Sequence, residues 1–163
     1  MAEGGEKSKI KLNVIFVCTG NTCRSPMAEF LFKDYLREKK RTGDFNVTSA
    51  GLEAGKGDVM TRQADEALTA LGVKHNPDRK ARVFTVQMSM DGDLIIGMTD
   101  EHAARTGSDN ATSFAELTGR PVADPFGMSV NTYLQCAEQI RAAFDKILEI
   151  ADELLKNKRA SAG

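Results

Sequence analysis

The fold is decided by a stretch near the N-terminus, residues 17–26, which reads VCTGNTCRSP. An apolar run over residues 12–17 leads into it, as is typical of a strand covered on both faces of a parallel sheet. Ser25 and Pro26 then have the side chains favoured at the N-cap and the first position of a helix. A strand that delivers a short loop onto a helix N-terminus gathers backbone N–H groups and the positive end of the helix dipole. The stretch therefore predicts an anion-binding loop.

The same loop holds the residue types needed for phosphoryl transfer. Cys18 opens it and Arg24 closes it, and the residues between them are enough to surround one tetrahedral anion. We expect the amides from Thr19 to Arg24 to point inward, with Gly20 supplying the unusual backbone torsions. Arg24 offers paired hydrogen bonds to phosphoryl oxygens, and the positive surroundings favour the nucleophilic thiolate of Cys18, to which Ser25 can donate. A buried structural cysteine is the alternative, which the accompanying glycine, arginine and serine disfavour.

Strands and helices alternate along the rest of the chain. We predict a helix to about residue 40, a strand over 45–50, a loop over 51–57, a helix over 59–71, a short helix over 85–90, a strand over 93–98, a helix over 100–105, a strand over 113–117, a loop over 118–129 and a last helix over 129–156. This alternation predicts an α/β fold of three layers, αβα, around a four-stranded parallel sheet. Ligands of such sheets bind outside the carboxyl ends of the strands, where the loop lies.

Length and composition predict one domain without nucleic-acid or membrane partners. The 163 residues suit a single domain, which we place at residues 10–158, with disordered tails at 1–9 and 159–163. The net charge of -1 comes from mixed signs, and no apolar run approaches the ~20 residues of a membrane span. Three cysteines do not make a disulfide framework, so we expect the protein in the reducing cytoplasm. We also expect it to be a monomer.

Residues 17–26 resemble the signature loop of the low-molecular-weight protein tyrosine phosphatases, a cysteine followed by five residues and Arg-Ser. The resemblance extends to residues 49–51 (SAG), to residues 98–102 (MTDEH) and to the Asp-Pro-Phe loop at residues 124–126. It implies the Rossmann-like, single-domain fold of that family and a two-step mechanism through a phosphocysteine. Cys18 would attack phosphorus while Arg24 and the loop amides hold the equatorial oxygens.

The resemblance also implies the remaining catalytic parts. Asp124 would protonate the leaving group and then act as base for the attacking water. Asn21 and Ser49 would support the loop through a polar network. The family often completes this network with a histidine before a Lys-Ala-Arg-type segment. Here Arg79 precedes residues 80–82 (KAR), and we interpret the nearest histidine, His75, as a surface turn residue.

Neither histidine is given a role, and no metal site is expected. We assign none to His75, nor to His102, which lies at a predicted helix start. No metal and no cofactor is implied, because the loop amides and Arg24 supply the positive charge.

Details of the motifs point to the substrate. Thr22 stands where tyrosine phosphatases of the family usually have isoleucine or leucine, and the loop over residues 51–58 lacks their flanking aromatic residue. Phe126 and Gly127 follow the Asp-Pro pair, where many eukaryotic members have paired tyrosines. The sequence CTGNTCRSP over residues 18–26, together with DPFG over residues 124–127, resembles the bacterial protein-arginine phosphatases. We therefore predict a phosphorylated protein as partner and phosphoarginine as the hydrolysed group, with phosphotyrosine as the alternative. The expected substrate-binding residues are Thr19, Gly20, Asn21, Thr22, Cys23, Ser25 and Phe126.

The chemistry of the guanidinium group favours phosphoarginine as the substrate. An apolar wall beside the planar, cationic guanidinium would leave N–H donors unpaired, at a cost of about 1–3 kcal/mol each. Thr22 is smaller and has a hydroxyl, and the Asp124 carboxylate can pair with the cation. The alternative is that Thr22 is a neutral variant.

Two rival functions and one regulatory hypothesis remain. Thiol-coupled arsenate reductases share the loop but need two further cysteines near the third strand; this chain has none between Cys23 and Cys136, which we interpret as a core residue. A non-catalytic phosphate-binding module is disfavoured because nucleophile, clamp and acid are all present. The enzyme is expected to be redox-sensitive, since in a loop curled around one anion the Cys23 sulfur could approach that of Cys18 and form a reversible disulfide under peroxide. The alternative is that Cys23 is a small packed side chain.

Overall fold

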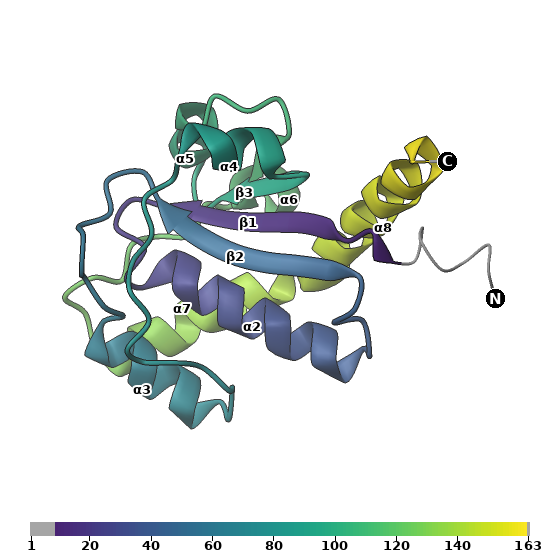
Figure 1. The fold of residues 1–163 in the computed structure, drawn as a ribbon. Coiled ribbons are helices and arrows are strands. Elements are labelled where there is room, and N and C mark those ends of the chain that lie inside the picture. Colours follow the sequence, from purple (N-terminus) through teal and green to yellow (C-terminus); the bar gives the residue numbers. More distant parts are fainter. Residues whose placement is uncertain (1–8, 163) are drawn as a thin grey trace.

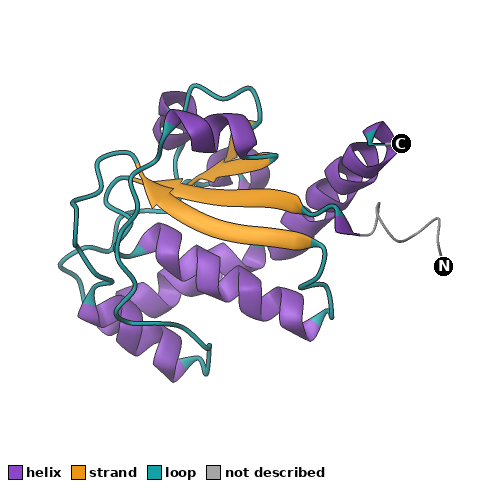
Figure 2. Ribbon diagram, in the orientation of Figure 1, coloured by secondary structure: helices purple, strands orange, loops and turns teal. Residues whose placement is uncertain are grey.

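The computed structural model describes residues 9–162, in which four parallel strands form one sheet between helices (Figures 1 and 2). The strands are β1 (Leu12–Cys18), β2 (Phe45–Gly51), β3 (Leu94–Gly97) and β4 (Ala111–Ser113), in the order β2-β1-β3-β4. β1 is therefore central, paired with β2 on one side and β3 on the other. The α/β fold with a four-stranded parallel sheet is confirmed.

Seven α-helices surround this sheet in the described part of the chain. They are α2 (Arg24–Glu38), α3 (Arg62–Ala70), α4 (Val86–Asp91), α5 (Asp100–Arg105), α6 (Phe114–Thr118), α7 (Val130–Ala142) and α8 (Phe144–Ser161), besides a short turn of 3₁₀ helix at Lys9. Figure 1 shows α2 and α7 on one side of the sheet and α4 and α5 on the other. None of these helices combines the length and the hydropathy that a membrane crossing requires.

The apolar side chains of β1 divide between two cores. Leu12, Val14 and Phe16 point into the larger core, which α2, α7 and α8 cover. Ile15 and Val17 point into a smaller core on the opposite face, beneath α4. Because successive residues of a strand point to opposite faces, an uninterrupted apolar run is what a central strand requires. The interpretation of residues 12–17 as a strand covered on both faces is confirmed.

The prediction of a strand over residues 113–117 was wrong. The fourth strand ends at Ser113, and residues 114–118 form α6. The Ser113 hydroxyl accepts a hydrogen bond from the Glu116 amide at 3.1 Å, which caps the helix. A serine followed three residues later by glutamate is a sequence signal for a helix start, and it was overlooked.

The last helix is two helices, not one. Ala143 separates α7 from α8, and its amide bonds to Ile140, three residues back, at 3.2 Å. The next residue, Phe144, packs its ring 5.0 Å from that of Phe32. The single apolar stripe that predicted one helix continues through the break, because both helices cover the same core.

The structure describes most of the predicted C-terminal tail but only the last residue of the predicted N-terminal tail. α8 continues to Ser161, so residues 159–161 are helical rather than part of a disordered tail. Lys158 explains why, since its ammonium group bonds the Lys11 carbonyl at 2.8 Å and the Asp93 carboxylate at 2.7 Å. The predicted N-terminal tail lies, except for Lys9, outside the described residues.

Candidate active site

The candidate site lies where β1 ends and the chain enters α2, at the carboxyl edge of the sheet. Cys18 is the last residue of β1 and is only 2% exposed. Its sulfur lies 2.8 Å from the Ser25 hydroxyl and accepts a hydrogen bond from the Asn21 amide at 3.3 Å. The sequence predicted Ser25 as the helix N-cap, but α2 begins at Arg24 and no side chain caps it. The Ser25 hydroxyl faces Cys18 instead.

The backbone of the signature loop, defined as residues 18–24, turns its carbonyl groups outward. The carbonyls of Cys18, Thr19 and Thr22 each accept a hydrogen bond from the segment 52–61, at 2.9 to 3.0 Å. In a planar trans peptide the carbonyl and the following N–H point in opposite directions, so the next amides face the loop interior. The amides that follow Thr19 and Thr22 bond no other described residue. The loop therefore presents free donors to an anion.

Asn21, not Gly20, takes the unusual backbone conformation of this loop. Its φ of 56° lies in the left-handed region, whereas Gly20 has no positive φ. A Cβ on Gly20 would meet only the Thr22 hydroxyl, at 3.6 Å. The expectation for Gly20 was wrong, because asparagine also adopts this conformation when its short amide is hydrogen-bonded locally. The cost is about 1–2 kcal/mol, so the Asn21 side chain must be held in place.

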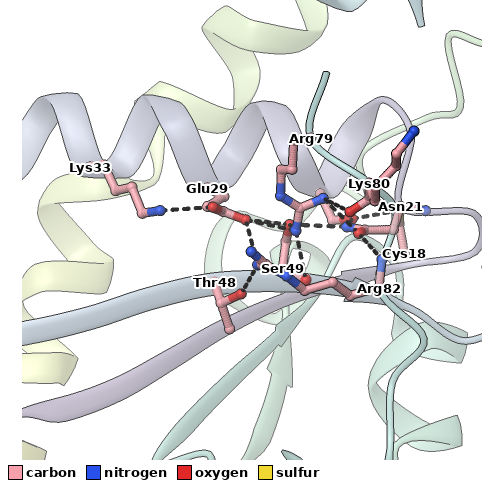
Figure 3. A network of polar contacts seen from close by, with 10 residues as sticks. Cys18, Asn21, Glu29, Lys33, Thr48, Ser49, Arg79, Lys80 and Arg82 are labelled. Atoms are coloured by element: carbon pink, nitrogen blue, oxygen red, sulfur yellow. Dashed lines mark hydrogen bonds and ion pairs between the residues drawn. The ribbon is translucent and has the colours of Figure 1, made fainter. Parts of the chain in front are cut away.

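Every hydrogen-bonding position of the Asn21 amide is used (Figure 3). Its nitrogen donates to the hydroxyls of Ser25, at 2.8 Å, and Ser49, at 3.0 Å. Its oxygen accepts from the Arg79 guanidinium and from the Arg82 backbone N–H, both at 2.9 Å. An amide has two donor hydrogens and two acceptor lone pairs, so nothing is left unpaired. The side chain ties the loop to β2 and to the segment 79–82.

Arg79 occupies the position at which the resemblance led us to expect a histidine. Its guanidinium donates to the Ser49 carbonyl at 3.0 Å and to the Ser49 hydroxyl at 2.9 Å, and it pairs with Glu29 at 3.0 Å. Both charged side chains are buried, with 6% and 2% exposed. Burial lowers the pKa of Arg79, and the charge of Glu29 opposes this effect.

Sequence reasoning missed Glu29 altogether and gave Arg79 no role. A signal for Glu29 was present, because it follows Ser25 by four residues and so lies on the same face of α2. Arg79 could have been found only by assuming that it replaces the expected histidine. His75 takes no part in the network: it bonds Asp65 and the Val73 carbonyl, both at 2.7 Å. Its side chain is only 8% exposed, so its interpretation as a surface residue was wrong.

His102 flanks the signature loop from α5, a contact that the sequence analysis did not assign. Its Nε2 and the Thr19 hydroxyl are 2.9 Å apart. The side chain is buried, and its Nδ1 has no hydrogen-bond partner among the described residues. Burial, with the Arg24 charge as a second cause, lowers the pKa of His102 from 6.5 to about 4. The imidazole is therefore neutral at neutral pH.

Asp124 meets the signature loop from the segment between α6 and α7, called here the Asp124 loop (residues 119–129). Its Oδ2 lies 3.8 Å from Nη2 of Arg24, while Nη1 of that arginine donates to the Val122 carbonyl at 3.0 Å. The Asp124 side chain is 55% exposed, whereas Arg24 is buried. The Arg24 Nε is buried without a partner among the described residues. An unpaired guanidinium N–H beside free loop amides suits an anionic ligand.

The other expected substrate-binding residues lie around this pair. The Cys23 thiol lies 3.8 Å from the Asp124 carboxylate, and burial, helped by the charges of Cys18 and Asp124, raises the pKa of Cys23 to about 12. Thr22 is half-buried, and its hydroxyl bonds no other described residue. Phe126 is 68% exposed, and its amide donates to the Asp124 carboxylate at 3.0 Å.

This arrangement can support substitution at phosphorus. The Cys18 thiol can act as the nucleophile and the Asp124 carboxyl as the acid–base group. The inward amides of the signature loop and the Arg24 guanidinium together form an anion-binding cradle. All these groups meet at one edge of the sheet. Over residues 9–162, no three His, Cys, Asp or Glu side chains are grouped so that they could hold a metal ion.

Comparisons with known proteins give the family. The family model described as low molecular weight phosphotyrosine protein phosphatase matches residues 13–160. A protein-arginine-phosphatase of Bacillus subtilis is 35% identical over 91% of this chain and 100% of its own length. A low molecular weight protein-tyrosine-phosphatase, PtpB, of Staphylococcus haemolyticus is 33% identical over 83% of this chain and 97% of its own.

A solved structure agrees with these relatives. The arginine phosphatase YwlE, in a Cys-to-Ser mutant with a phosphorylated active-site serine, is 33% identical, with a TM-score of 0.76 over 91% of this chain and 99% of that one. In that relative, the side chain that replaces the cysteine carries phosphate. The chain belongs to the low molecular weight phosphotyrosine protein phosphatase family and is a phosphatase, a hydrolase.

Proposed function

We propose that the protein is a protein-arginine phosphatase that acts through a phosphocysteine at Cys18. One observation carries the phosphatase chemistry: the buried, unpaired Nε of Arg24 and the free loop amides lie beside the Cys18 sulfur and the Asp124 carboxylate. The same donors that bind a phosphoryl group in the ground state can follow its charge into the transition state.

In the first step, the Cys18 thiolate attacks phosphorus in line with the leaving nitrogen of phosphoarginine. A P–S bond forms as the P–N bond breaks, and Asp124 gives its proton to the departing nitrogen. Arg24 and the loop amides hold the three equatorial oxygens. The products are phosphocysteine and a free arginine side chain, with Asp124 left as a carboxylate.

In the second step, water attacks the phosphorus of the phosphocysteine. The Asp124 carboxylate takes a proton from the water as the P–O bond forms and the P–S bond breaks. The sulfur departs as a thiolate, and the Ser25 hydroxyl, 2.8 Å away, donates a hydrogen bond that stabilises it. Inorganic phosphate leaves, and Asp124 is again protonated for the next turnover.

Thr22 supports phosphoarginine as the substrate. Its half-buried hydroxyl is unused by the described part of the protein, so it is free to accept from a substrate N–H. The exposed carboxyl group of Asp124 can also accept a hydrogen bond from a guanidinium N–H while its own proton faces the leaving nitrogen. The similarity to the Bacillus subtilis protein-arginine-phosphatase, 35% identical, supports the same choice.

Phosphotyrosine is the second candidate, and Phe126 is the observation that favours it. Its ring is 68% exposed next to Asp124, where it could stack on the phenyl ring of a bound phosphotyrosine. The relative PtpB, a tyrosine phosphatase by name, is nearly as similar to this chain.

Turnover of matched peptides tests the choice. Two peptides that differ only in carrying phosphoarginine or phosphotyrosine are compared by kcat/KM, for the wild type and for Thr22→Ile. We expect the wild type to prefer phosphoarginine, and Thr22→Ile to shift the preference toward phosphotyrosine by at least about tenfold, because the apolar branch leaves guanidinium donors unpaired. Thr69→Ile, on an exposed position of α3, is the matched control.

Each outcome has a distinct meaning. A wild type that prefers phosphotyrosine would contradict the proposed substrate. A Thr22→Ile variant with an unchanged preference would remove Thr22 as the discriminating residue.

A further inference from the structure

A buried arginine, Arg79, stands at the start of a line of hydrogen bonds that ends on the Cys18 sulfur, and Figure 3 shows the first of these bonds, from Arg79 to Asn21. Arg79 bonds the Asn21 oxygen at 2.9 Å, the Asn21 nitrogen bonds the Ser25 hydroxyl at 2.8 Å, and that hydroxyl lies 2.8 Å from the sulfur. Residues 79 and 18 come from distant parts of the sequence, and the contacts run behind the signature loop rather than through its anion-binding face.

The direction of each bond in this line follows from the chemistry of arginine. A guanidinium donates and never accepts, so the Asn21 atom that faces Arg79 must be the carbonyl oxygen. The Arg82 backbone N–H, also only a donor, meets the same atom at 2.9 Å. The NH₂ group of Asn21 is therefore turned toward Ser25, whose hydroxyl accepts from it. That leaves the Ser25 proton to point at the Cys18 sulfur.

Ser49 satisfies the same requirement. Its hydroxyl accepts from Asn21 at 3.0 Å and from Arg79 at 2.9 Å, and its one proton goes to Glu29 at 2.7 Å. A hydroxyl has one proton and two lone pairs, so this pattern uses all of them. No alternative orientation of the Asn21 amide keeps all these bonds, because a reversed amide would place donors against donors.

Charge acts in the same sense as the bond directions. Glu29 holds Arg79 through Oε1 at 3.0 Å, while its Oε2 is neutralised by Lys33 at 2.8 Å. The cluster therefore keeps a positive charge behind the loop. The charge of Cys18, together with that of Glu29, favours the charged form of Arg79 by raising its pKa against the effect of burial. Since a guanidinium does not lose its proton in proteins, neither the charge nor the bond directions change with pH.

We propose that Arg79, anchored by Glu29, is a positioning residue that fixes every donor in the line Asn21–Ser25 toward the Cys18 sulfur and so keeps the thiolate hydrogen-bonded at any working pH. A histidine in this place could donate or accept, and it would titrate near neutrality. The inference rests on the proposed function only in taking Cys18 as the nucleophile.

The test measures alkylation of Cys18 by iodoacetamide as a function of pH, with the modified residue identified by mass spectrometry. Arg79→Met removes the first donor, so we expect the rate at pH 6 to fall about tenfold and the whole profile to move to higher pH. Arg79→Lys keeps the charge but offers a single point donor, and an intermediate rate is expected. Arg62→Met, an exposed arginine of α3, is the control and keeps the wild-type profile.

A double-mutant cycle with Ser25→Ala tests whether Arg79 acts on Cys18 through Ser25 or only by holding the signature loop in place. Ser25→Ala removes the last link, so Arg79→Met should cost less than about twofold in that background. An equal loss in both backgrounds, or an unchanged profile in folded Arg79→Met protein, would overturn the proposal.

Two safeguards keep the test decisive. Removing Arg79 alone takes away the close partner of the buried Glu29 Oε1, which leaves Lys33 at 2.8 Å from Oε2 and Arg82 at 3.7 Å from Oε1, so the variant can fail to fold. Glu29→Gln with Arg79→Met removes both charges, and the same tenfold loss at pH 6 is expected of it; a wild-type profile there contradicts the proposal. Alkylation uses no phosphorylated substrate, so its outcome is independent of whether phosphoarginine is the correct substrate.

Discussion

The two sides of the active site are built in opposite ways. Behind the signature loop, Asn21, Ser49 and Arg79 are each 8% exposed or less, and every hydrogen-bonding position of Asn21 is used. Across from it, Asp124 is 55% exposed, and its loop borders an open hollow of about 680 Å³ beside α7. In the proposed function, the buried side fixes the geometry of phosphoryl binding, and the exposed side meets the protein substrate.

This contrast divides the chemistry as well. The cradle must hold its donors in one arrangement, because a transition state gains only from groups that are already in place. In the proposed mechanism, the Asp124 carboxyl group must reach different atoms in two steps, first the leaving nitrogen and then a water. Changes on the two sides should therefore have different signatures.

The largest effect is expected from the exposed side. Asp124→Asn removes the proton donor and acceptor, so kcat on phosphoarginine peptide should fall about 10²–10⁴-fold. The cradle is intact in this variant, so the inhibition constant of inorganic phosphate should change little. Steady-state kinetics measure both quantities, with the exposed Asp109→Asn as control. A phosphate affinity that falls together with kcat would mean that Asp124 also shapes the cradle.

The second-largest effect on activity is expected from a substitution that displaces the backbone of the signature loop. A Cβ on Gly51 would lie 2.6 Å from the Thr19 carbonyl oxygen and 2.9 Å from the Asn21 nitrogen, and neither backbone atom can move without the loop. Gly51→Ala should lower kcat/KM about 100-fold and weaken phosphate inhibition with it. Gly43→Ala, where a Cβ meets nothing within 4 Å, is the matched control. Normal phosphate inhibition in Gly51→Ala would show that the loop is not as tightly held as its contacts indicate.

How much of this could be predicted differs between the two sides. Cys18, Arg24 and Asp124 could be named from the sequence, because each belongs to a short motif with its own neighbours. Arg79 could not, since its partners Asn21 and Glu29 lie 50 or more residues away in the sequence. They become neighbours only when the segment that follows Arg79 runs along the end of β2, where Gly51 bridges Val83. Buried polar partners of this kind follow from topology rather than from local pattern.

The fold shows the same limit. Strand β1 and helix α2 follow directly from an apolar run and a helix start, both of which are local signals. The break at Ala143 carries no proline or glycine, so periodicity alone predicts one continuous helix. The α6 start at Ser113 had a local signal, but the short apolar stretch around it suits a strand equally well.

A smaller effect is expected on stability, from His102 beside the cradle. Its pKa is lowered from 6.5 to about 4 in the folded protein, so between these values the unfolded chain binds the proton more readily. Stability should then fall as the pH drops from 7 to 4.5, with His102 contributing about 2 kcal/mol to the loss. Urea unfolding of wild type and His102→Gln at both pH values measures it. Parallel losses in the two proteins would contradict a buried, neutral His102.

The smallest effect on turnover is expected from Cys23, between the two sides. Peroxide would convert the Cys18 thiolate to a sulfenic acid, and the Cys23 sulfur would displace water from it to form a disulfide that added thiol reduces. Oxidation removes the Cys18 charge, one cause of the high pKa of Cys23. Cys23→Ser should keep untreated turnover within about twofold but lose recovery after peroxide. Cys136→Ala, in the core, is the control; full recovery in Cys23→Ser would exclude the disulfide.

The central claim is that the phosphoryl group is transferred to the Cys18 sulfur on the buried side of the site. Asp124, on the exposed side, is needed to release it as inorganic phosphate. Asp124→Asn protein is mixed with phosphoarginine peptide, quenched in denaturant within one turnover, and analysed by mass spectrometry. We expect phosphoryl groups on Cys18, because the departing nitrogen can still take a proton from solvent in the slowed first step, whereas the second step has lost the base that activates water. Phosphate released into solution while Cys18 stays unmodified would contradict the phosphocysteine mechanism.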